Sequence, residues 1–321
     1  MKLFEIIKKR SSNGQTKAAV AEKRNIGIRK FDKNVYNDIV DYLEENTYKT
    51  GINTIWFNGV PLDFIFQFNA IKKPLFVFFH GAVDQSKTII PHFVGLSYKR
   101  LIEANLLHIA DSSLIHERSL RTGWYLGCSR IQLLEVIKNI VQHLSKFFET
   151  ERIIFFGSSG GGFPSLCLSQ MIPGSLSIVN SPATTVKKHP HRATRVSQYL
   201  KVAFSAQNDE EEDHILNTLL KSDLQEGFNH NVGNVIYLLN KNDHGNIKFH
   251  SLPFFKQFSE KICLTENSVQ RIGSIFLVTG DWGRGHRYPP PRILNRLFSK
   301  VTDRKVEWSD VLTENTLKEL L

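Results

Sequence analysis

The sequence predicts an α/β fold built on a doubly wound, mostly parallel sheet, and three observations support this fold class. Apolar runs of strand length alternate with segments of helical periodicity through most of the chain. Several runs, such as residues 75–79, are apolar at every position, which is typical of strands buried on both faces. Polar or glycine-rich residues follow these runs, where the functional loops of such sheets lie.

Length and composition indicate one globular enzyme-sized protein. The 321 residues can bury one large core, and hydrophobic and charged fractions of 41% and 22% exclude a disordered or fibrous chain. No apolar run reaches the roughly 18 to 20 residues of a membrane-spanning helix, and the charged N-terminal residues do not match a secretion signal. We therefore expect a cytoplasmic protein whose three widely spaced cysteines are reduced thiols.

The formal net charge of +10 suits an acidic partner, such as an acidic polysaccharide, anionic lipid headgroups or nucleic acid. Basic residues occur as scattered doublets, without the interleaved aromatic residues or reader motif that nucleic-acid binding requires. A solvated basic surface is the simpler explanation. The charge thus allows peripheral membrane contact, predicts no specific nucleic-acid binding and gives no information on the oligomeric state.

The chain divides into an N-terminal extension and one main domain. We assign residues 1–50 to a helical extension, because residues 36–45 have apolar positions at helical spacing. Residues 51–321 carry the alternating pattern of the sheet. Within them, residues 183–231 are basic first and acidic later, a long stretch that predicts a helical cap inserted between two strands.

The main domain begins with an antiparallel hairpin at one edge of the sheet. Apolar residues 54–57 and 62–66 flank Asn58-Gly59, a pair that readily takes the positive φ angles of a tight turn. The elements that follow alternate in type. The predicted strands are residues 75–79, 106–110, 153–156, 176–179, 235–239 and 275–278, and the predicted helices are residues 131–148 and the segment after Ser159.

A predicted nucleophile lies in Gly157-Ser158-Ser159-Gly160-Gly161, which follows a buried strand and matches the pattern G-x-S-x-G. A sharp turn from strand to helix strains the central residue, needs small neighbours and directs helix N–H groups at the reacting centre. Ser159 is therefore the predicted nucleophile, and Ser158 is the residue most easily mistaken for it. The alternatives are a phosphate-binding turn and a purely structural turn, but the spacing matches neither a P-loop nor a dinucleotide fingerprint.

A serine hydroxyl is a weak nucleophile until a base takes its proton, so a histidine and an acid are expected at later strand ends. His286 lies at the centre of a glycine- and proline-rich loop after the predicted strand at residues 275–278, and it is the predicted base. Asp243 follows the strand at residues 235–239 and is the predicted acid, which would fix the imidazole tautomer.

Alternatives remain open for both partners of the serine. Asp281 also follows a strand and is the next candidate acid, and Asp111 is a third. Among the 12 histidines, four others compete with His286: His80, His108, His244 and His250.

Acyl transfer also needs N–H donors for the developing oxyanion. Gly160 supplies one amide directly after the nucleophile, and the turn His80-Gly81-Ala82 after an early strand supplies the other, from Gly81 or Ala82. A simple turn at a strand end is the alternative explanation. No bound cofactor or metal is expected, and the candidate substrate-binding residues are His80, Trp282, Lys187 and Lys188.

The order Ser159, Asp243, His286, with His80-Gly81 before them, resembles the α/β-hydrolase superfamily over roughly residues 54–300. Five short motifs are also similar to those of members found with bacterial surface-polysaccharide biosynthesis, some of which are sugar O-acetyltransferases. These motifs are Phe79-His80-Gly81-Ala82, Gly123-Trp124-Tyr125-Leu126-Gly127, residues 157–162, Asn180-Ser181-Pro182 and residues 285–290.

The resemblance implies a serine-dependent acyl transfer, namely O-acetylation of a bacterial polysaccharide or sugar with acetyl-coenzyme A as donor. Basic residues of the cap, Lys187, Lys188, Arg192 and Arg195, would then meet the phosphates of the donor or an acidic glycan. The alternatives are an esterase that releases the acyl group to water, a catalytically silent binding module in glycan assembly, and a peptidase that uses the same triad.

Overall fold

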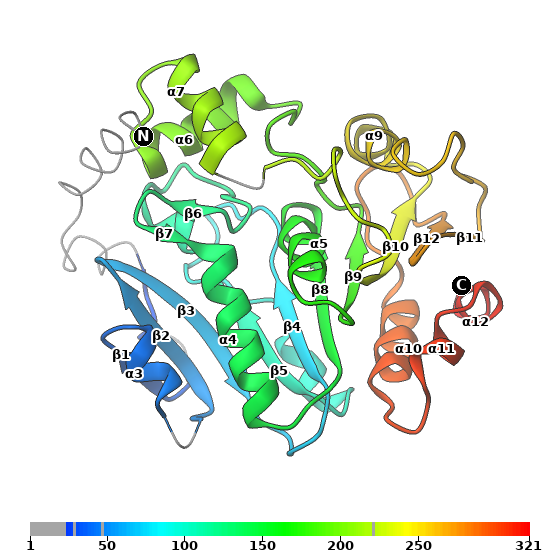
Figure 1. The fold of residues 1–321 in the computed structure, drawn as a ribbon, viewed down its shortest axis with the longest axis horizontal. Coiled ribbons are helices and arrows are strands. Elements are labelled where there is room, and N and C mark those ends of the chain that lie inside the picture. The colour runs from blue at the N-terminus through cyan, green and yellow to red at the C-terminus, as the bar shows by residue number, and fades with distance from the viewer. Residues whose placement is uncertain (1–23, 28–29, 46–47, 220–221) are drawn as a thin grey trace.

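The computed structural model describes residues 24–27, 30–45, 48–219 and 222–321. One ten-stranded sheet has the spatial order β1-β2-β3-β5-β4-β8-β9-β10-β12-β11, and a two-stranded ribbon, β6 (Gly127–Cys128) and β7 (Ile131–Gln132), is separate from it (Figure 1). The strands of the sheet are β1 (Lys33–Tyr36), β2 (Gly51–Phe57), β3 (Val60–Gln67), β4 (Leu75–Phe79), β5 (Asn105–Ile109), β8 (Ile153–Ser158), β9 (Leu176–Asn180), β10 (Asn234–Asn240), β11 (Ser268–Ile272) and β12 (Ile275–Gly280).

Most neighbouring strands run parallel, which confirms the predicted α/β class. The six adjacent strands β5, β4, β8, β9, β10 and β12 are mutually parallel. Strand β3 is antiparallel to both of its neighbours, and β11 is antiparallel to β12. Parallel strands direct their carboxyl ends to the same sheet edge, so the loops after these six strands meet there.

The predicted hairpin joins β2 to β3, and Asn58 and Gly59 have φ angles of 48° and 83° in its two-residue turn. The sheet does not end at this hairpin, because β1 pairs with β2 in parallel. Residues 1–23 of the predicted helical extension lie outside the described residues. In the described remainder, the short helix α3 (Ile39–Leu43) follows β1, so this segment supplies both a strand and a helix.

Helices cover both faces of the sheet, and β4 shows how its residues alternate between them. Val77 and Phe79 pack with α4 and α5 on one face, whereas Phe76 and Phe78 pack with α10, α11 and α12 on the other. Because helices cover both faces of the sheet and exclude water from each, the side chains on both sides of β4 are apolar. The helices besides α3 are α4 (Leu133–Phe147), α5 (Gly162–Met171), α6 (Ser197–Phe204), α7 (Asp209–His214), α8 (His244–Asn246), α9 (Leu252–Phe255), α10 (Pro291–Thr302), α11 (Trp308–Val311) and α12 (Glu314–Lys318).

The segment between β9 and β10 contains the helices α6 and α7 and packs on the β6-β7 ribbon. Helices α6 and α7, yellow-green in Figure 1, lie at the top of the view beside this ribbon. The Tyr199 hydroxyl of α6 donates to the carbonyl of Gly127 at 2.8 Å, and the Ser129 amide donates to the Ala203 carbonyl at 3.1 Å. The insertion therefore stands at the edge of the sheet where the parallel strands end.

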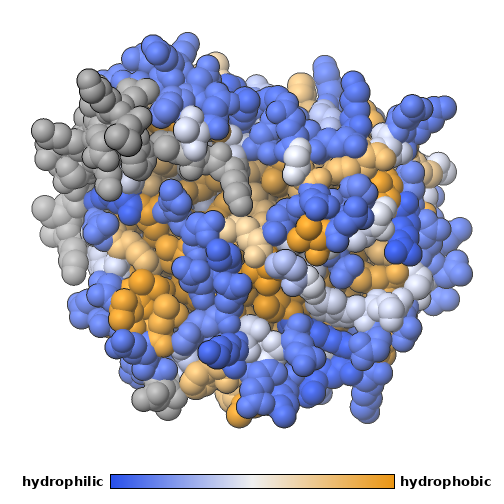
Figure 2. Space-filling view, viewed as in Figure 1, coloured by the Kyte–Doolittle hydropathy of each residue, from blue (hydrophilic) through white to orange (hydrophobic). Residues whose placement is uncertain are grey.

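The surface seen in Figure 2 is mainly hydrophilic, with apolar areas exposed between the polar side chains near the middle of the face. Within the described residues, no helix combines the length and the apolar character needed to cross a membrane. The cysteines are free thiols, of which Cys128 and Cys167 are buried.

Candidate active site

The parallel strands bring the predicted residues to one edge of the sheet. His80 directly follows β4, and Ser159 directly follows β8. Asp243 and His286 lie in the loops that leave β10 and β12. Residues that are more than 200 positions apart in the chain are therefore neighbours, in the place where doubly wound sheets bind their ligands.

Ser159 occupies a strained turn between β8 and α5. Its φ angle is 54°, a left-handed conformation that side chains rarely adopt away from functional sites. The turn is tight, because a Cβ on Gly157 would lie 2.0 Å from the Gly161 carbonyl oxygen, and a Cβ on Gly161 would lie 2.5 Å from the Phe79 carbonyl oxygen. The Ala183 amide donates to the Ser159 carbonyl at 2.8 Å and fixes the turn from the β9 side.

Asp243 and His286 form a close pair, with 2.5 Å between Asp243 Oδ2 and His286 Nδ1. The other carboxylate oxygen accepts from the Asn246 amide at 3.1 Å. Burial acts to raise the pKa of Asp243, but the hydrogen bonds from His286 and Asn246 outweigh it and hold this pKa below its ordinary value. The ionised carboxylate keeps the proton of the neutral imidazole on Nδ1, so Nε2 is the atom free to accept one.

No hydrogen bond joins Ser159 to His286 within the described residues. Within the described residues the Ser159 hydroxyl makes no hydrogen bond. Ser158, its neighbour, lines the same cavity as His286, whose side chain is 42% exposed. Contacts between nucleophile and base are often loose without substrate, so this arrangement suits a base that approaches the serine when the site fills.

The amides of Gly160 and Ala82 lie on facing segments beside Ser159. A Cβ on Gly160 would lie 3.9 Å from the Ala82 nitrogen, and a Cβ on Gly81 would lie 3.9 Å from the Gly160 nitrogen. Within the described residues, the Ala82 amide has no hydrogen-bond acceptor. The two nitrogens therefore lie on facing segments beside Ser159, as expected for the predicted oxyanion hole.

His80 orients the peptide that carries the Ala82 amide. Its Nδ1 lies 2.7 Å from the Gly81 carbonyl oxygen, and its Nε2 accepts from the Asp111 amide at 3.1 Å. Burial lowers the pKa of His80, although the Asp111 carboxylate acts in the opposite direction. A neutral His80 thus donates to the Gly81 carbonyl, and because C=O and N–H of a trans peptide point in opposite directions, the Ala82 amide points away from His80.

A second strained loop, which the sequence singled out as one of the resembling motifs but without a role, packs beside the glycine turn. Trp124 and Tyr125 are buried and have φ angles of 50° and 58°. The Asp111 carboxylate accepts from the amide of Tyr125 at 3.4 Å and from that of Gly123 at 2.8 Å. A Cβ on Gly160 would lie 3.8 Å from the Trp124 ring, so this loop forms one wall beside the nucleophile.

Asn240, at the end of β10, holds the loop that carries His286. Its buried Nδ2 donates to the carbonyls of Gly283 and Gly285 at 2.8 and 2.6 Å, and its Oδ1 accepts from the Trp282 amide at 3.1 Å. The side chain thereby closes the glycine-rich segment just before His286. A lone asparagine at a strand end gave no pattern from which this role could be predicted.

The competing acids have other partners in the structure. Asp281 forms an ion pair with Lys241 at 3.0 Å and accepts from the Asn242 side chain at 2.8 Å. The Asp111 carboxylate accepts hydrogen bonds from the amides of Gly123 and Tyr125, as described above. The competing histidines are also placed elsewhere: His108 is buried and lies 2.7 Å from the Val94 carbonyl oxygen, and His244 is exposed at the start of α8. Among the candidates, only His286 pairs with Asp243.

Two histidines form a neutral cluster on the cap side of the triad. The rings of His189 and His250 are 5.5 Å apart, and the Trp124 ring lies 5.4 Å from that of His189. Burial, with the nearby His250, lowers the pKa of His189 to about 3, and burial lowers that of His250 to about 4. Uncharged rings of this kind present hydrogen-bonding and apolar surface to a ligand rather than positive charge.

The predicted substrate-binding residues are not in one place. Lys188 forms ion pairs with Asp223 at 3.0 Å and with Glu226, so its charge is neutralised by carboxylates of the cap itself. Lys187, beside it, is only partly exposed and forms no ion pair within the described residues. Trp282 and His80, in contrast, both line a cavity of about 850 Å³ that also contacts His286.

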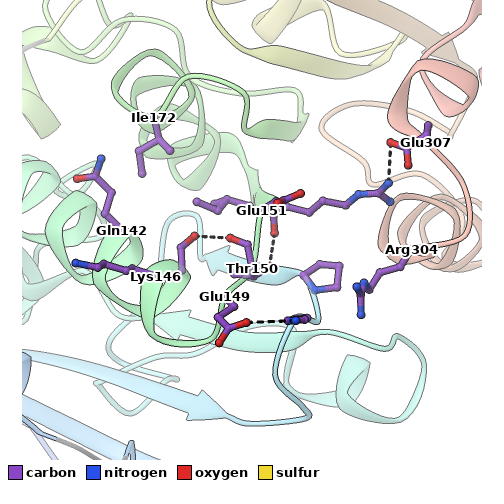
Figure 3. A pocket seen from close by; sticks show the side chains of 13 residues that line it. Gln142, Lys146, Glu149, Thr150, Glu151, Ile172, Arg304 and Glu307 are labelled. Atoms are coloured by element: carbon purple, nitrogen blue, oxygen red, sulfur yellow. Dashed lines mark hydrogen bonds and ion pairs between the residues drawn. The ribbon is translucent and has the colours of Figure 1, made fainter.

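A second hollow, of about 880 Å³, lies at the opposite edge of the sheet (Figure 3). Ile153, the first residue of β8, lines it, whereas Ser159 follows the last residue of that strand. Its polar groups are mainly engaged with one another, as in the ion pair of Arg152 with Glu307 at 3.2 Å and that of Lys72 with Glu149 at 3.4 Å. The cavity beside His286 is therefore the one relevant to the chemistry.

No protein-family model matches this sequence, and a comparison with curated proteins finds no match. Solved structures do share its fold. The capsule O-acetyltransferase of Neisseria meningitidis serogroup A has a TM-score of 0.51 and 19% identity, covering 77% of this chain and 92% of its own. The same protein in complex with caged gadolinium gives a TM-score of 0.50 and 18% identity, with the same coverage.

A glycosylation-associated protein complex from Streptococcus agalactiae gives a TM-score of 0.48 and 17% identity, covering 70% of this chain and 41% of its own. At 19% and 18% identity, the two matches with TM-scores of 0.51 and 0.50 show a shared fold. The resemblance predicted from the motifs is thereby confirmed as a likeness of fold.

Proposed function

We propose that this protein is an α/β-hydrolase-fold serine acyltransferase that moves an acetyl group from acetyl-coenzyme A to a hydroxyl of a bacterial polysaccharide or sugar. The observation that carries the proposal is the contact of 2.5 Å between Asp243 and His286 at the sheet edge where Ser159 sits in a strained turn. An acid–histidine pair and a strained serine at the same sheet edge are the components that nucleophilic acyl transfer needs.

In the first half-reaction, His286 Nε2 accepts the proton of Ser159 as the serine oxygen bonds to the acetyl carbonyl carbon. The amides of Gly160 and Ala82 stabilise the oxyanion of the tetrahedral intermediate. Its collapse breaks the carbon–sulfur bond, and His286 returns the proton to the departing thiolate. Asp243 stabilises the imidazolium throughout and remains ionised.

In the second half-reaction, an acceptor hydroxyl gives its proton to His286 and attacks the acetyl-serine carbonyl. Collapse breaks the bond to Ser159, and the serine oxygen regains the proton from His286. The acceptor is expected on the cap side, where His189 and His250, whose Nδ1 atoms accept from the amides of His191 and Thr184, can donate hydrogen bonds from Nε2.

Hydrolysis is the second candidate function, and the exposure of His286 favours it. A base that is 42% exposed is accessible to water, which competes with an acceptor hydroxyl for the acyl-enzyme. The fold of the capsule O-acetyltransferase supports transfer, and the open histidine supports an esterase. Only the fate of the acyl group separates the two.

Acyl release with p-nitrophenyl acetate and acetyl-coenzyme A, with and without an acidic oligosaccharide, tests the proposal. Turnover that depends on Ser159 and rises with the oligosaccharide, with acetyl recovered on the sugar, supports transfer. Equal turnover into water with or without sugar supports an esterase. Ser159→Ala is the inactive variant, and Ser169→Ala is the matched control, because its buried hydroxyl only bonds within α5. Consumption of neither donor refutes catalysis.

A further inference from the structure

The cavity beside His286 has a mainly apolar and aromatic lining. Its volume of about 850 Å³ is in the range of small-molecule sites. The lining includes Phe79, Val94, Tyr98, Phe156, Trp282 and Leu294. Because Ser158 and His286 also line it, the cavity leads to the edge of the sheet where the nucleophile lies.

Positive charge gathers at one side of this cavity. Arg287 lines it, and Arg284 and Arg292 are exposed in the same loop and at the start of α10. Within the described residues, none of these three guanidinium groups forms an ion pair or a hydrogen bond. No carboxylate lines the cavity, and the nearby Asp281 is already paired with Lys241.

The direction of α10 adds to this charge. The helix has 12 residues, and Pro291 and Leu294 of its first turn line the cavity. The N-terminal end of a helix carries partial positive charge, and here no side chain caps it. A phosphate at this end would meet both the helix N-terminus and unpaired arginines, each of which favours an anion.

Two of the four basic cap residues named above differ from these arginines in having carboxylate partners. Lys188 is paired with Asp223 and Glu226, and Arg192 with Glu212 and Asp213. The charges of these two residues are largely neutralised within the cap. The sequence-based expectation placed the donor phosphates or an acidic glycan at the four cap residues, whereas the loop after β12 combines unpaired arginines with a cavity next to His286.

We propose that this cavity is the acyl-donor site and takes a thioester carried on a phosphorylated pantetheine, with Arg284, Arg287 and Arg292 binding the phosphates. This inference rests on the function proposed above. The apolar lining suits the pantetheine arm, and guanidinium groups suit phosphate because they can form two parallel hydrogen bonds to it. The thioester end would then lie towards His286, and the cap side would remain open for the acceptor.

Binding of coenzyme A and of pantetheine to the wild type and to an Arg284→Gln/Arg287→Gln variant tests this site by titration calorimetry. Pantetheine has no phosphate, so the wild type is expected to bind coenzyme A more tightly by about tenfold or more. The double variant is expected to lose that preference and keep its affinity for pantetheine. Arg292→Gln should reduce the preference in part.

Arg296→Gln is the matched control, because Arg296 is an exposed arginine of the same helix that lies one turn further from its N-terminus than Arg292. In steady-state assays the double variant is expected to raise KM for acetyl-coenzyme A about tenfold. Arg296→Gln should give the wild-type KM for acetyl-coenzyme A.

Three results would overturn the donor site: an unchanged coenzyme A preference in the double variant, an equal loss in Arg296→Gln, or a raised KM for the sugar acceptor instead of the donor. Failure of the proposed function gives a different result. In that case Ser159 would not react with a fluorophosphonate probe and p-nitrophenyl acetate would not be hydrolysed, while the comparison of coenzyme A with pantetheine would still report on the site.

Discussion

Asn240→Asp is expected to reduce catalysis without unfolding the protein. The substitution keeps the size of the side chain and the oxygen that accepts from Trp282, but it removes the two donated hydrogen bonds to Gly283 and Gly285, of 2.8 and 2.6 Å. Each lost bond removes about 1 kcal/mol, and an unpaired carboxylate at this buried position faces the two carbonyl oxygens, so the ordered position of the loop loses about 3 to 5 kcal/mol. Because that loop carries His286, kcat/KM should fall by about tenfold or more.

The assay is hydrolysis of p-nitrophenyl acetate together with the rate at which a fluorophosphonate labels Ser159. Both rates should fall by the same factor, since both need His286 in place, while the free energy of unfolding in urea falls by about 3 to 5 kcal/mol and leaves the protein folded. Asn242→Ala is the matched control. This substitution removes one hydrogen bond, of 2.8 Å to Asp281, in the loop after β10. It leaves the bonds of the Asn240 side chain to Trp282, Gly283 and Gly285 in place, so the variant should retain full activity.

An Asn240→Asp protein with wild-type labelling and hydrolysis would refute this reasoning. It would show that the loop holds His286 without Asn240. A large loss of catalytic activity in Asn242→Ala would also contradict it. That result would show that any change in the segment after β10 impairs catalysis, whichever hydrogen bond is removed.

Three further predictions concern stability. Gly157→Ala should cost roughly 3 kcal/mol or more, because its Cβ would lie 2.0 Å from a carbonyl oxygen, whereas Gly245→Ala, with its nearest atom at 3.9 Å, should be near neutral in urea unfolding. Burial lowers the pKa of His108 from 6.5 to about 4, so the unfolded chain takes up the proton first as pH falls. The contribution of neutral His108 to the free energy of unfolding is complete above pH 6.5 and is lost towards pH 4, at about 1.4 kcal/mol per pH unit. The free energy of unfolding of His108→Gln should therefore fall less steeply between pH 6.5 and pH 4 than that of the wild type. Equal slopes in the two proteins would contradict this prediction. Arg24→Met should cost about 3 to 5 kcal/mol, because it leaves the buried carboxylate of Asp63 unpaired, and a cost below about 1 kcal/mol would show that water reaches Asp63.

The strands of the sheet were predictable because buried parallel strands are apolar at every position. Residues 75–79 and 235–239 are uniformly apolar and coincide closely with β4 and β10. Strands β1 and β11 were not predicted, because they lie at the two sheet edges and their side chains are mostly exposed or half-buried. An edge strand buries little apolar surface, so its sequence has no apolar run to indicate it.

The candidate site was predictable as far as its residues follow strand ends. Ser159, Asp243 and His286 could be named because each lies just after a recognisable strand, and parallel strands end together. The supporting contacts could not, because they join distant segments. Nothing near Lys188 in sequence shows that Asp223 and Glu226 neutralise it, and nothing near Asn240 shows that its amide closes the loop before His286.

Peptide mass spectrometry after incubation with acetyl-coenzyme A in the absence of acceptor tests the central claim most directly. We predict one acetyl group on Ser159 that disappears when the acceptor sugar is added, and no modification of that peptide in Ser159→Ala. Asp243→Asn should slow its appearance, because the imidazole loses the carboxylate that fixes its tautomer and stabilises its charge. Consumption of acetyl-coenzyme A by Ser159→Ala at the wild-type rate would contradict an acyl-enzyme on this serine.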